Sequence, residues 1–106
     1  MSGRKVRRTV VVLELLGTDS AAEKLGARGI SVDEAQQLID NRYEILPNRG
    51  RARHGRRRVQ VRRLLIGHTD GGRALTLVVE RTHDPTTWLI VTGWSATDEQ
   101  RRMIED

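Results

Sequence analysis

The sequence predicts a small α+β domain, in which one twisted antiparallel sheet of about four strands carries two N-terminal helices and a C-terminal helix. Three observations favour this class. The chain has 106 residues, which suits a single domain over residues 1–106 with one modest core. Apolar runs of strand length recur between turn residues, mainly in the second half. Ser31 precedes Glu34, and Thr97 precedes Gln100, by three residues, a spacing that is typical of a helix start.

The helices are indicated by apolar residues three or four apart and by their boundary residues. Ser31 with Glu34, and Thr97 with Gln100, form capping boxes, because each hydroxyl can accept from the amide three residues on. Gly29 suits the left-handed position that follows a helix end. The expected helices cover residues 20–28, 32–41 and 97–106.

The strands are indicated by alternating apolar residues between turn signals. Asp70-Gly71 predicts a hairpin turn, because this pair tolerates the positive φ angles that such turns need. A register break is expected near Arg62 and Arg63. All helices are expected on one face of the sheet, and residues 1–5 are expected to form a disordered tail. The expected strands cover residues 6–15, 43–46, 59–69, 73–81 and 88–94.

The composition favours a cytoplasmic location. No run approaches the roughly 20 apolar residues needed to span a bilayer, and the longest runs, Val10–Leu13 and Trp88–Val91, have strand length. The basic N-terminus lacks the apolar region of a secretory signal. The absence of cysteine excludes disulfides and Cys-based zinc sites. We therefore expect a cytoplasmic protein that does not use a membrane as a partner.

Positive charge is concentrated in the middle of the chain. The net charge is +5, but residues 45–81 hold ten basic and two acidic side chains. Residues 49–58 contain six arginines and no apolar periodicity, which predicts a mobile loop. Arginine suits phosphate contacts because its planar fork donates two parallel hydrogen bonds, so we expect binding to a polyanion such as RNA. The alternative is a solvated loop that only keeps the protein in solution. The candidate nucleic-acid-binding residues are Arg49, Arg51, Arg53, Arg56, Arg57, Arg58, Arg62 and Arg73.

Residues for RNA cleavage can also be named. Metal-independent cleavage needs a base for the 2′-hydroxyl, a cation for the phosphorane charge and an acid for the leaving group. His54 and His68, and less directly His83, are candidates for proton transfer, because histidine titrates near neutral pH. Arg63 and Arg81 are the candidate cations. The alternative is that these histidines are surface turn residues. No pair of histidines stands at metal-ligand spacing, so neither a metal nor another cofactor is expected.

The two tryptophans, Trp88 and Trp94, stand six residues apart in the last expected strand. Strand alternation places both on the same face of the sheet. In a chain without phenylalanine, large aromatic residues favour a role in the core or at a partner interface. The alternative is that they stack on RNA bases.

A series of short segments carries a resemblance to a known family. These segments are Arg28–Ala35, Leu65–Gly67, Leu77–Arg81 and Ile90–Thr92. In order and spacing they resemble the BrnT-type ribonuclease toxins and a related family of small uncharacterised bacterial domains, over residues 18–102. The resemblance implies a RelE/ParE-like antiparallel sheet with helices on one side, an activity on RNA and neutralisation by an antitoxin protein.

The resemblance also implies roles for single residues. The family's arginine before its Ile-Gly step falls on Arg62 or Arg63, and the arginine that ends the next strand falls on Arg81. This chain departs from the pattern at two positions: Trp94 stands where the family has an arginine in the last strand, and Ser20 stands where the related family has a histidine.

We therefore expect a toxin of a type II toxin–antitoxin pair that acts on RNA, as an endoribonuclease or as a ribosome-directed binder. Two alternatives stay open. The first is a non-catalytic nucleic-acid-binding domain that uses the same arginines, and the second is an interaction module for an acidic protein. The expected partners are RNA, free or on the ribosome, and an antitoxin protein.

Overall fold

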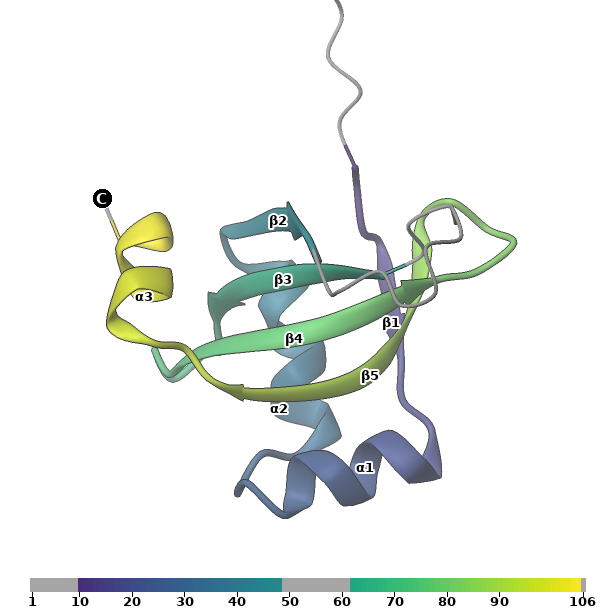
Figure 1. Ribbon diagram of the computed structural model, residues 1–106, viewed down its shortest axis with the longest axis horizontal. Coiled ribbons are helices and arrows are strands. Elements are labelled where there is room, and N and C mark those ends of the chain that lie inside the picture. The colour runs from purple at the N-terminus through teal and green to yellow at the C-terminus, as the bar shows by residue number, and fades with distance from the viewer. Residues whose placement is uncertain (1–9, 49–61, 106) are drawn as a thin grey trace, which may run out of the picture.

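The computed structural model describes residues 10–48 and 62–105 and has the expected α+β class (Figure 1). It contains five strands, three α-helices and one 3-10 helix within these residues. In chain order the elements are β1 (Glu14–Leu16), α1 (Asp19–Gly26), α2 (Val32–Gln37), the 3-10 helix η1 (Leu38–Asp40), β2 (Tyr43–Pro47), β3 (Arg62–His68), β4 (Ala74–Arg81), β5 (Thr87–Ser95) and α3 (Asp98–Ile104).

The sheet has five strands in the order β1-β5-β4-β3-β2 and is mixed. Strands β2 to β5 form antiparallel neighbours, as expected. Strand β1 instead runs parallel to β5, with Leu15 opposite Trp88. The expected antiparallel sheet of about four strands is therefore wrong in this detail. The reason is that β1 pairs with the edge of the last strand, through a contact between residues more than seventy positions apart.

The first strand is shorter than residues 6–15, of which residues 6–9 lie outside the described residues. Only Glu14–Leu16 pair as a strand, and the preceding segment makes scattered contacts instead. The Leu13 amide donates to the Thr86 carbonyl, and the Val12 amide donates to the Tyr43 hydroxyl. Val12 is buried whereas Val11 and Leu13 are exposed, so this extended segment passes behind the sheet with one side against the core (Figure 1).

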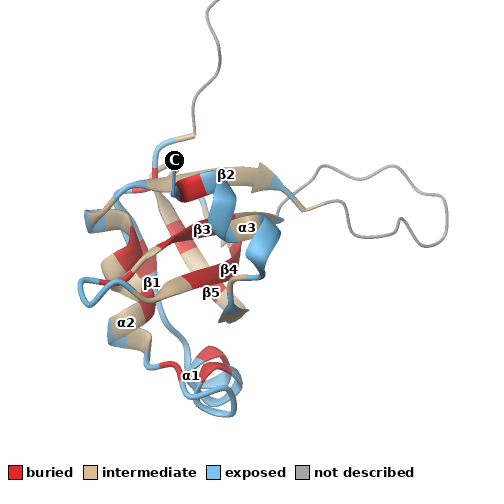
Figure 2. Cartoon of the chain, turned by 90° about the vertical axis from the view of Figure 1, so that its left-hand side faces the viewer, coloured by how far each residue is buried: buried red, intermediate tan, exposed pale blue. Residues whose placement is uncertain are grey.

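The two faces of the sheet are covered by different helices, which corrects the expectation that all helices share one face. Strand alternation turns Leu75 and Leu77 towards α1 and α2, where they join the core. Thr76 between them faces the other way, and its hydroxyl donates to Gln100 of α3 at 2.8 Å. Helix α3 therefore lies on the opposite face, against β3 and β2 (Figure 2). The face of the sheet that carries α3 is called the open face below, because α3 covers only one end of it (Figure 1).

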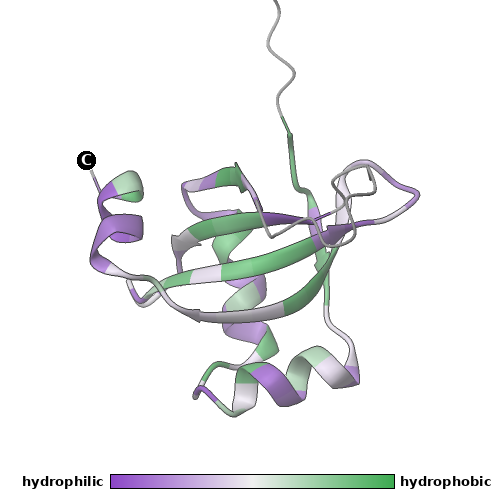
Figure 3. Ribbon diagram, viewed as in Figure 1, coloured by the Kyte–Doolittle hydropathy of each residue, from purple (hydrophilic) through white to green (hydrophobic). Residues whose placement is uncertain are grey.

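The core lies between the sheet and the pair α1–α2. It is built mainly from aliphatic side chains, together with Trp88. Apolar residues predominate along β4, whereas α3 is mainly hydrophilic (Figure 3). The buried residues that form this core are Val12, Leu15, Ala21, Leu25, Ile30, Ala35, Leu38, Leu65, Leu75, Leu77, Val79, Trp88 and Ile90.

Both predicted capping boxes are confirmed. The Ser31 hydroxyl accepts from the Glu34 amide while the Glu34 carboxylate accepts from the Ser31 amide. Thr97 and Gln100 make the equivalent pair at the start of α3. Gly29 has a φ of 72°, as expected after a helix end. Helix α2 is shorter than predicted, since its last turn tightens into η1 before the chain enters β2.

Strand β5 contains a bulge that the alternation pattern does not reveal. Val78 pairs with Thr92 but the next residue, Val79, pairs with Ile90, which leaves Val91 as an extra residue. The pairing of β3 with β4 is continuous, so the register break expected near Arg62 is wrong for the described strand. Because an extra residue reverses the alternation, the expectation that Trp88 and Trp94 share a face is also wrong.

Candidate nucleic-acid interface

The excess positive charge of the protein lies outside the residues that the structure describes. The described residues hold nine basic and thirteen acidic side chains, a net charge of −4. Residues 1–9 and 49–61 hold four and six basic side chains and no acidic one. The excess of cations therefore belongs to two segments outside the described residues. The expected loop over 49–58, the tail over 1–5 and the candidates Arg49, Arg51, Arg53, His54, Arg56, Arg57 and Arg58 lie there, and their roles stay predictions.

The arginine segment is attached at one end of the sheet. It connects β2 to β3, which form a hairpin whose last described pair is Pro47 with Arg63. Strand β4 runs antiparallel to β3, so its final residue, Arg81, lies at the same end. We call this end, formed by Arg62, Arg63 and Arg81, the cationic end. The fold thus brings three of the predicted site residues to the place where six further arginines are tethered.

Arg63 and Arg81 lie on the same face of the sheet as diagonal neighbours. Arg63 pairs with Val79, and Arg81 is two residues further along β4. Such a diagonal separates the Cα atoms by about 7–8 Å. Arg81 is exposed and Arg63 is half-buried, and neither side chain makes a hydrogen bond or ion pair with another described residue. Two arginines at diagonal positions on neighbouring strands, without a carboxylate partner among the described residues, favour the binding of an anion.

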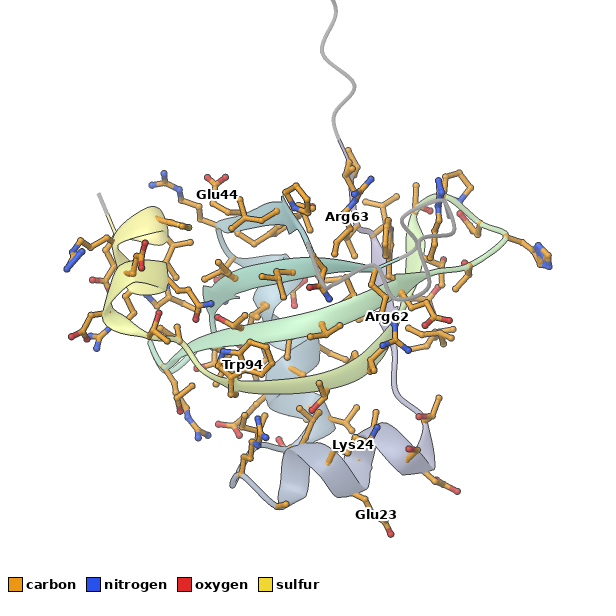
Figure 4. All side chains as sticks on the ribbon, viewed as in Figure 1. Glu23, Lys24, Glu44, Arg62, Arg63 and Trp94 are labelled. Atoms are coloured by element: carbon orange, nitrogen blue, oxygen red, sulfur yellow. The ribbon has the colours of Figure 1, made fainter. Side chains whose placement is uncertain are left out.

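Arg62 differs from its neighbour because it points to the open face and has a partner. Its Nε donates to the Glu80 carboxylate at 3.0 Å, across the β3–β4 pair (Figure 4). Both side chains are partly exposed, so this ion pair is weak and can exchange for a phosphate contact. Arg62 therefore becomes available to a phosphate at the cationic end only when its ion pair with Glu80 opens.

Arg73 is engaged within the fold and lies away from the cationic end. Its guanidinium donates to the Gly29 carbonyl at 3.0 Å and to the Glu34 carboxylate at 3.2 Å. It thereby ties the β3–β4 turn to the start of α2. The pKa of Glu34 is lowered, first by the hydrogen bond from the Ser31 amide and further by the charge of Arg73. These contacts give Arg73 a structural role in addition to the predicted one.

His68 is not brought together with the candidate cations. It ends β3 at the other end of the sheet, where its Nε2 lies 3.5 Å from a Glu105 carboxylate oxygen. Strand alternation also points it to the face opposite Arg63 and Arg81. His83 lies nearer to Arg81, in the exposed turn after β4. In that turn the Thr86 amide lowers the pKa of Asp84 by a hydrogen bond. Among described residues, no histidine and arginine therefore form an evident acid–base site.

The two tryptophans have different surroundings. Trp88 is buried in the core, and its indole donates to the Pro85 carbonyl. Trp94 is half-buried, stands opposite Thr76 on the open face and lies outside the core. On the α1 side of β5, Arg28, which follows α1, donates to the Gly93 carbonyl at 3.1 Å. This contact could not be predicted from the sequence, because 65 residues separate its partners.

Other kinds of site find no support in the part of the chain that the structure describes. No group of three His, Cys, Asp or Glu residues is placed to hold a metal ion within residues 10–48 and 62–105. No helix among these residues is long and apolar enough to cross a membrane.

Comparisons with known proteins do not add to this description. No family model matches the chain, and no curated protein or solved structure matches it. The resemblance to BrnT-type toxins therefore stays a prediction.

Proposed function

We propose that the protein binds RNA, with the arginines of residues 49–58 and the cationic end as its phosphate-binding surface. The observation that carries this proposal is the separation of charge. A body with net charge −4 carries six arginines on one hairpin connection, next to Arg63 and Arg81, which have no acidic partner among the described residues. An acidic body repels other polyanions, so a concentrated cationic segment directs them to one end.

The affinity of such a surface comes mainly from the release of counterions and depends little on sequence. Arg63 and Arg81 would add phosphate contacts at fixed backbone positions, because both residues lie in paired strands. This combination favours a general RNA-binding domain. Within the proposal, the protein would act in the cytoplasm.

Cleavage of RNA is a second proposal, supported by the adjacent pair Arg63 and Arg81. In an endoribonuclease these guanidinium groups would stabilise the charge of the phosphorane. Proton transfer would then fall to His54 or His83, since His68 is at the other end of the sheet. A role as the toxin of a type II pair would add an antitoxin protein as partner. RNA binding has more support than RNA cleavage, because binding needs only the arginine charges, whereas cleavage also needs an acid and a base.

The test is the salt dependence of RNA affinity. Single-strand binding should weaken with a log–log slope of about −0.7 per phosphate contact. Replacing Arg56, Arg57 and Arg58 by alanine should flatten this slope by roughly two units. The matched control replaces Arg42, Arg101 and Arg102, which removes the same charge from other exposed places.

An equal change of the salt-dependence slope in both triple variants would show that the slope depends only on net charge. That result would contradict the assignment of the phosphate-binding surface to Arg56, Arg57 and Arg58. Cleavage is read from the same mixtures on a gel. Arg81→Ala should lower any cleavage rate about a hundredfold or more while the protein stays folded. Intact RNA with the wild-type protein would leave binding as the function and remove the enzyme.

A further inference from the structure

We propose that Glu80 competes with RNA phosphates for Arg62 and thereby limits how tightly the cationic end binds RNA. The inference rests on the proposed RNA binding and names a residue that regulates the same surface. It starts from a difference among the three arginines of the cationic end. Arg62 has a carboxylate partner, whereas the side chains of Arg63 and Arg81 have none among the described residues.

The pair of Arg62 and Glu80 uses only part of what each side chain offers. The two residues stand directly opposite each other on β3 and β4, and Nε of Arg62 donates to Oε1 of Glu80 at 3.0 Å. A guanidinium has five N–H donors, and a bidentate pair with a carboxylate would use two of them. Within residues 10–48 and 62–105, the terminal nitrogens of Arg62 donate to no acceptor. The single contact therefore leaves most donors of Arg62 for a phosphate.

The strength of this ion pair is similar to that of one phosphate contact. The side chains of Arg62 and Glu80 are 49% and 35% exposed. An exposed pair of this kind changes an equilibrium constant by roughly two- to fivefold. One contact with a single-strand phosphate contributes about fivefold for each tenfold fall in salt concentration. Because the two contributions are comparable, the carboxylate and a phosphate compete for the same guanidinium.

The place of Glu80 in the sheet makes this competition relevant to RNA. Glu80 directly precedes Arg81 in β4, and Arg62 directly precedes Arg63 in β3. Strand alternation places Arg62 and Glu80 on the open face and the two other arginines on the opposite face. An RNA strand bound by those two arginines lies at the same end of the sheet as Arg62. It gains this third cation only by displacing Glu80.

The experiment compares Glu80→Gln with Glu44→Gln, each of which removes one negative charge. Glu44 is the matched control, because its carboxylate has no hydrogen bond or ion pair with another described residue and is well separated from Arg62 (Figure 4). The probe is a ten-nucleotide oligouridylate, whose dissociation constant is measured at a series of salt concentrations. At about 0.1 M salt, Glu80→Gln should tighten binding roughly two- to fivefold. Glu44→Gln should have little effect, because charges more than about 10 Å apart are screened.

A double-mutant cycle separates competition from a change in net charge. Arg62→Ala should weaken oligouridylate binding more in the Glu80→Gln background than in the wild type, because the guanidinium is then free of its carboxylate partner. The log–log slope against salt should steepen by up to about 0.7 in Glu80→Gln, which is the contribution of one phosphate contact. This gain should disappear in the double variant. Thermal melts of all variants separate changes in binding from loss of the fold.

Two results would overturn the inference and leave RNA binding intact: equal effects of Glu80→Gln and Glu44→Gln on affinity, or an Arg62→Ala loss of the same size in both backgrounds. A lowered melting temperature of Glu80→Gln with an unchanged salt slope would also overturn it, and would assign the pair to holding β3 against β4. If neither the wild type nor Glu80→Gln bound oligouridylate, the proposed function itself would be removed together with the inference.

Discussion

Gly93 determines how closely helix α1 approaches the sheet. A Cβ atom at this position would lie 2.7 Å from Cδ2 of Leu77, 2.9 Å from the carbonyl oxygen of Thr76 and 3.1 Å from Cδ2 of Leu25. The carbonyl belongs to a paired central strand and cannot move aside cheaply. Gly26, at the end of α1, has nothing within 4 Å of its virtual Cβ. The two glycines therefore serve different purposes.

We predict that Gly93→Ala destabilises the protein by about 1–3 kcal/mol, because the added methyl overfills the contact between α1 and the sheet. Gly26→Ala should stabilise it by about 0.5–1 kcal/mol, because alanine is the better helix former. Urea denaturation of both variants measures the two effects. A shift of the same sign in both would contradict the packing argument.

Some residue positions followed from the sequence and others did not. Gly29 and the two capping hydroxyls were predictable, since their signals lie within four residues. The face of Trp94 was not, because one bulged residue, Val91, reverses an alternation that otherwise holds. Arg73 was counted among the phosphate-binding arginines, and its attachment to Glu34 depends on a contact 39 residues away.

At the scale of elements, the start of α2 depends on three groups. The Glu34 carboxylate accepts from the Ser31 amide and from Arg73. These contacts lower its pKa below the ordinary value of 4.5. A carboxyl with a lowered folded-state pKa contributes stability that is present above its unfolded pKa and is lost as the pH falls through the folded pKa.

We predict that Glu34→Ala lowers the thermal unfolding midpoint by a few degrees at pH 7, and that its difference from the wild type shrinks at pH 3. The control is Glu23→Ala on α1, whose carboxylate has no hydrogen bond or ion pair with another described residue and points away from the domain (Figure 4). Melting curves at both pH values measure the effect. A deficit of equal size at pH 3 would show that the charge of Glu34 is not involved.

The existence of most elements could be predicted, whereas their placement could not. The two capping boxes marked two helix starts correctly, and Asp70-Gly71 marked the position of the β3–β4 turn, although the positive φ angle falls on Gly72. Local hydrogen bonds decide these boundaries. The side of the sheet on which α3 lies depends on Thr76 and Ile104, whose contacts form only after the sheet is assembled. Arg63 and Arg81 were named separately from the sequence, and the β3–β4 register then made them neighbours.

For the whole molecule, the edge strand β1 closes the core. Leu15 is only 2% exposed and stands opposite Trp88, while Leu13, two residues before it, is 68% exposed. Two leucines that are only two residues apart thus lie in different environments, one buried and one exposed. The parallel pairing of β1 with β5 escaped prediction, because no local signal records a contact between such distant residues.

We predict that Leu15→Ala costs about 2–5 kcal/mol of stability, as expected for a cavity in a core. Leu13→Ala should change stability by less than about 0.5 kcal/mol. Denaturant titration of both variants at equal protein concentration measures the difference. A comparable loss in Leu13→Ala would show that its exposed side chain contacts another molecule.

The pairing of β1 with β5 has a consequence for synthesis on the ribosome. Leu15 leaves the translation machinery more than seventy residues before Trp88, its partner in the sheet. At about 5–20 residues per second, this interval lasts roughly 4 to 15 seconds. During it, Leu15 lacks the strand β5 beside which it is buried in the native sheet, so the nascent chain presents part of its apolar segment next to a cluster of basic residues. Such a segment is open to chaperones, and the native sheet is completed only when the last strand emerges.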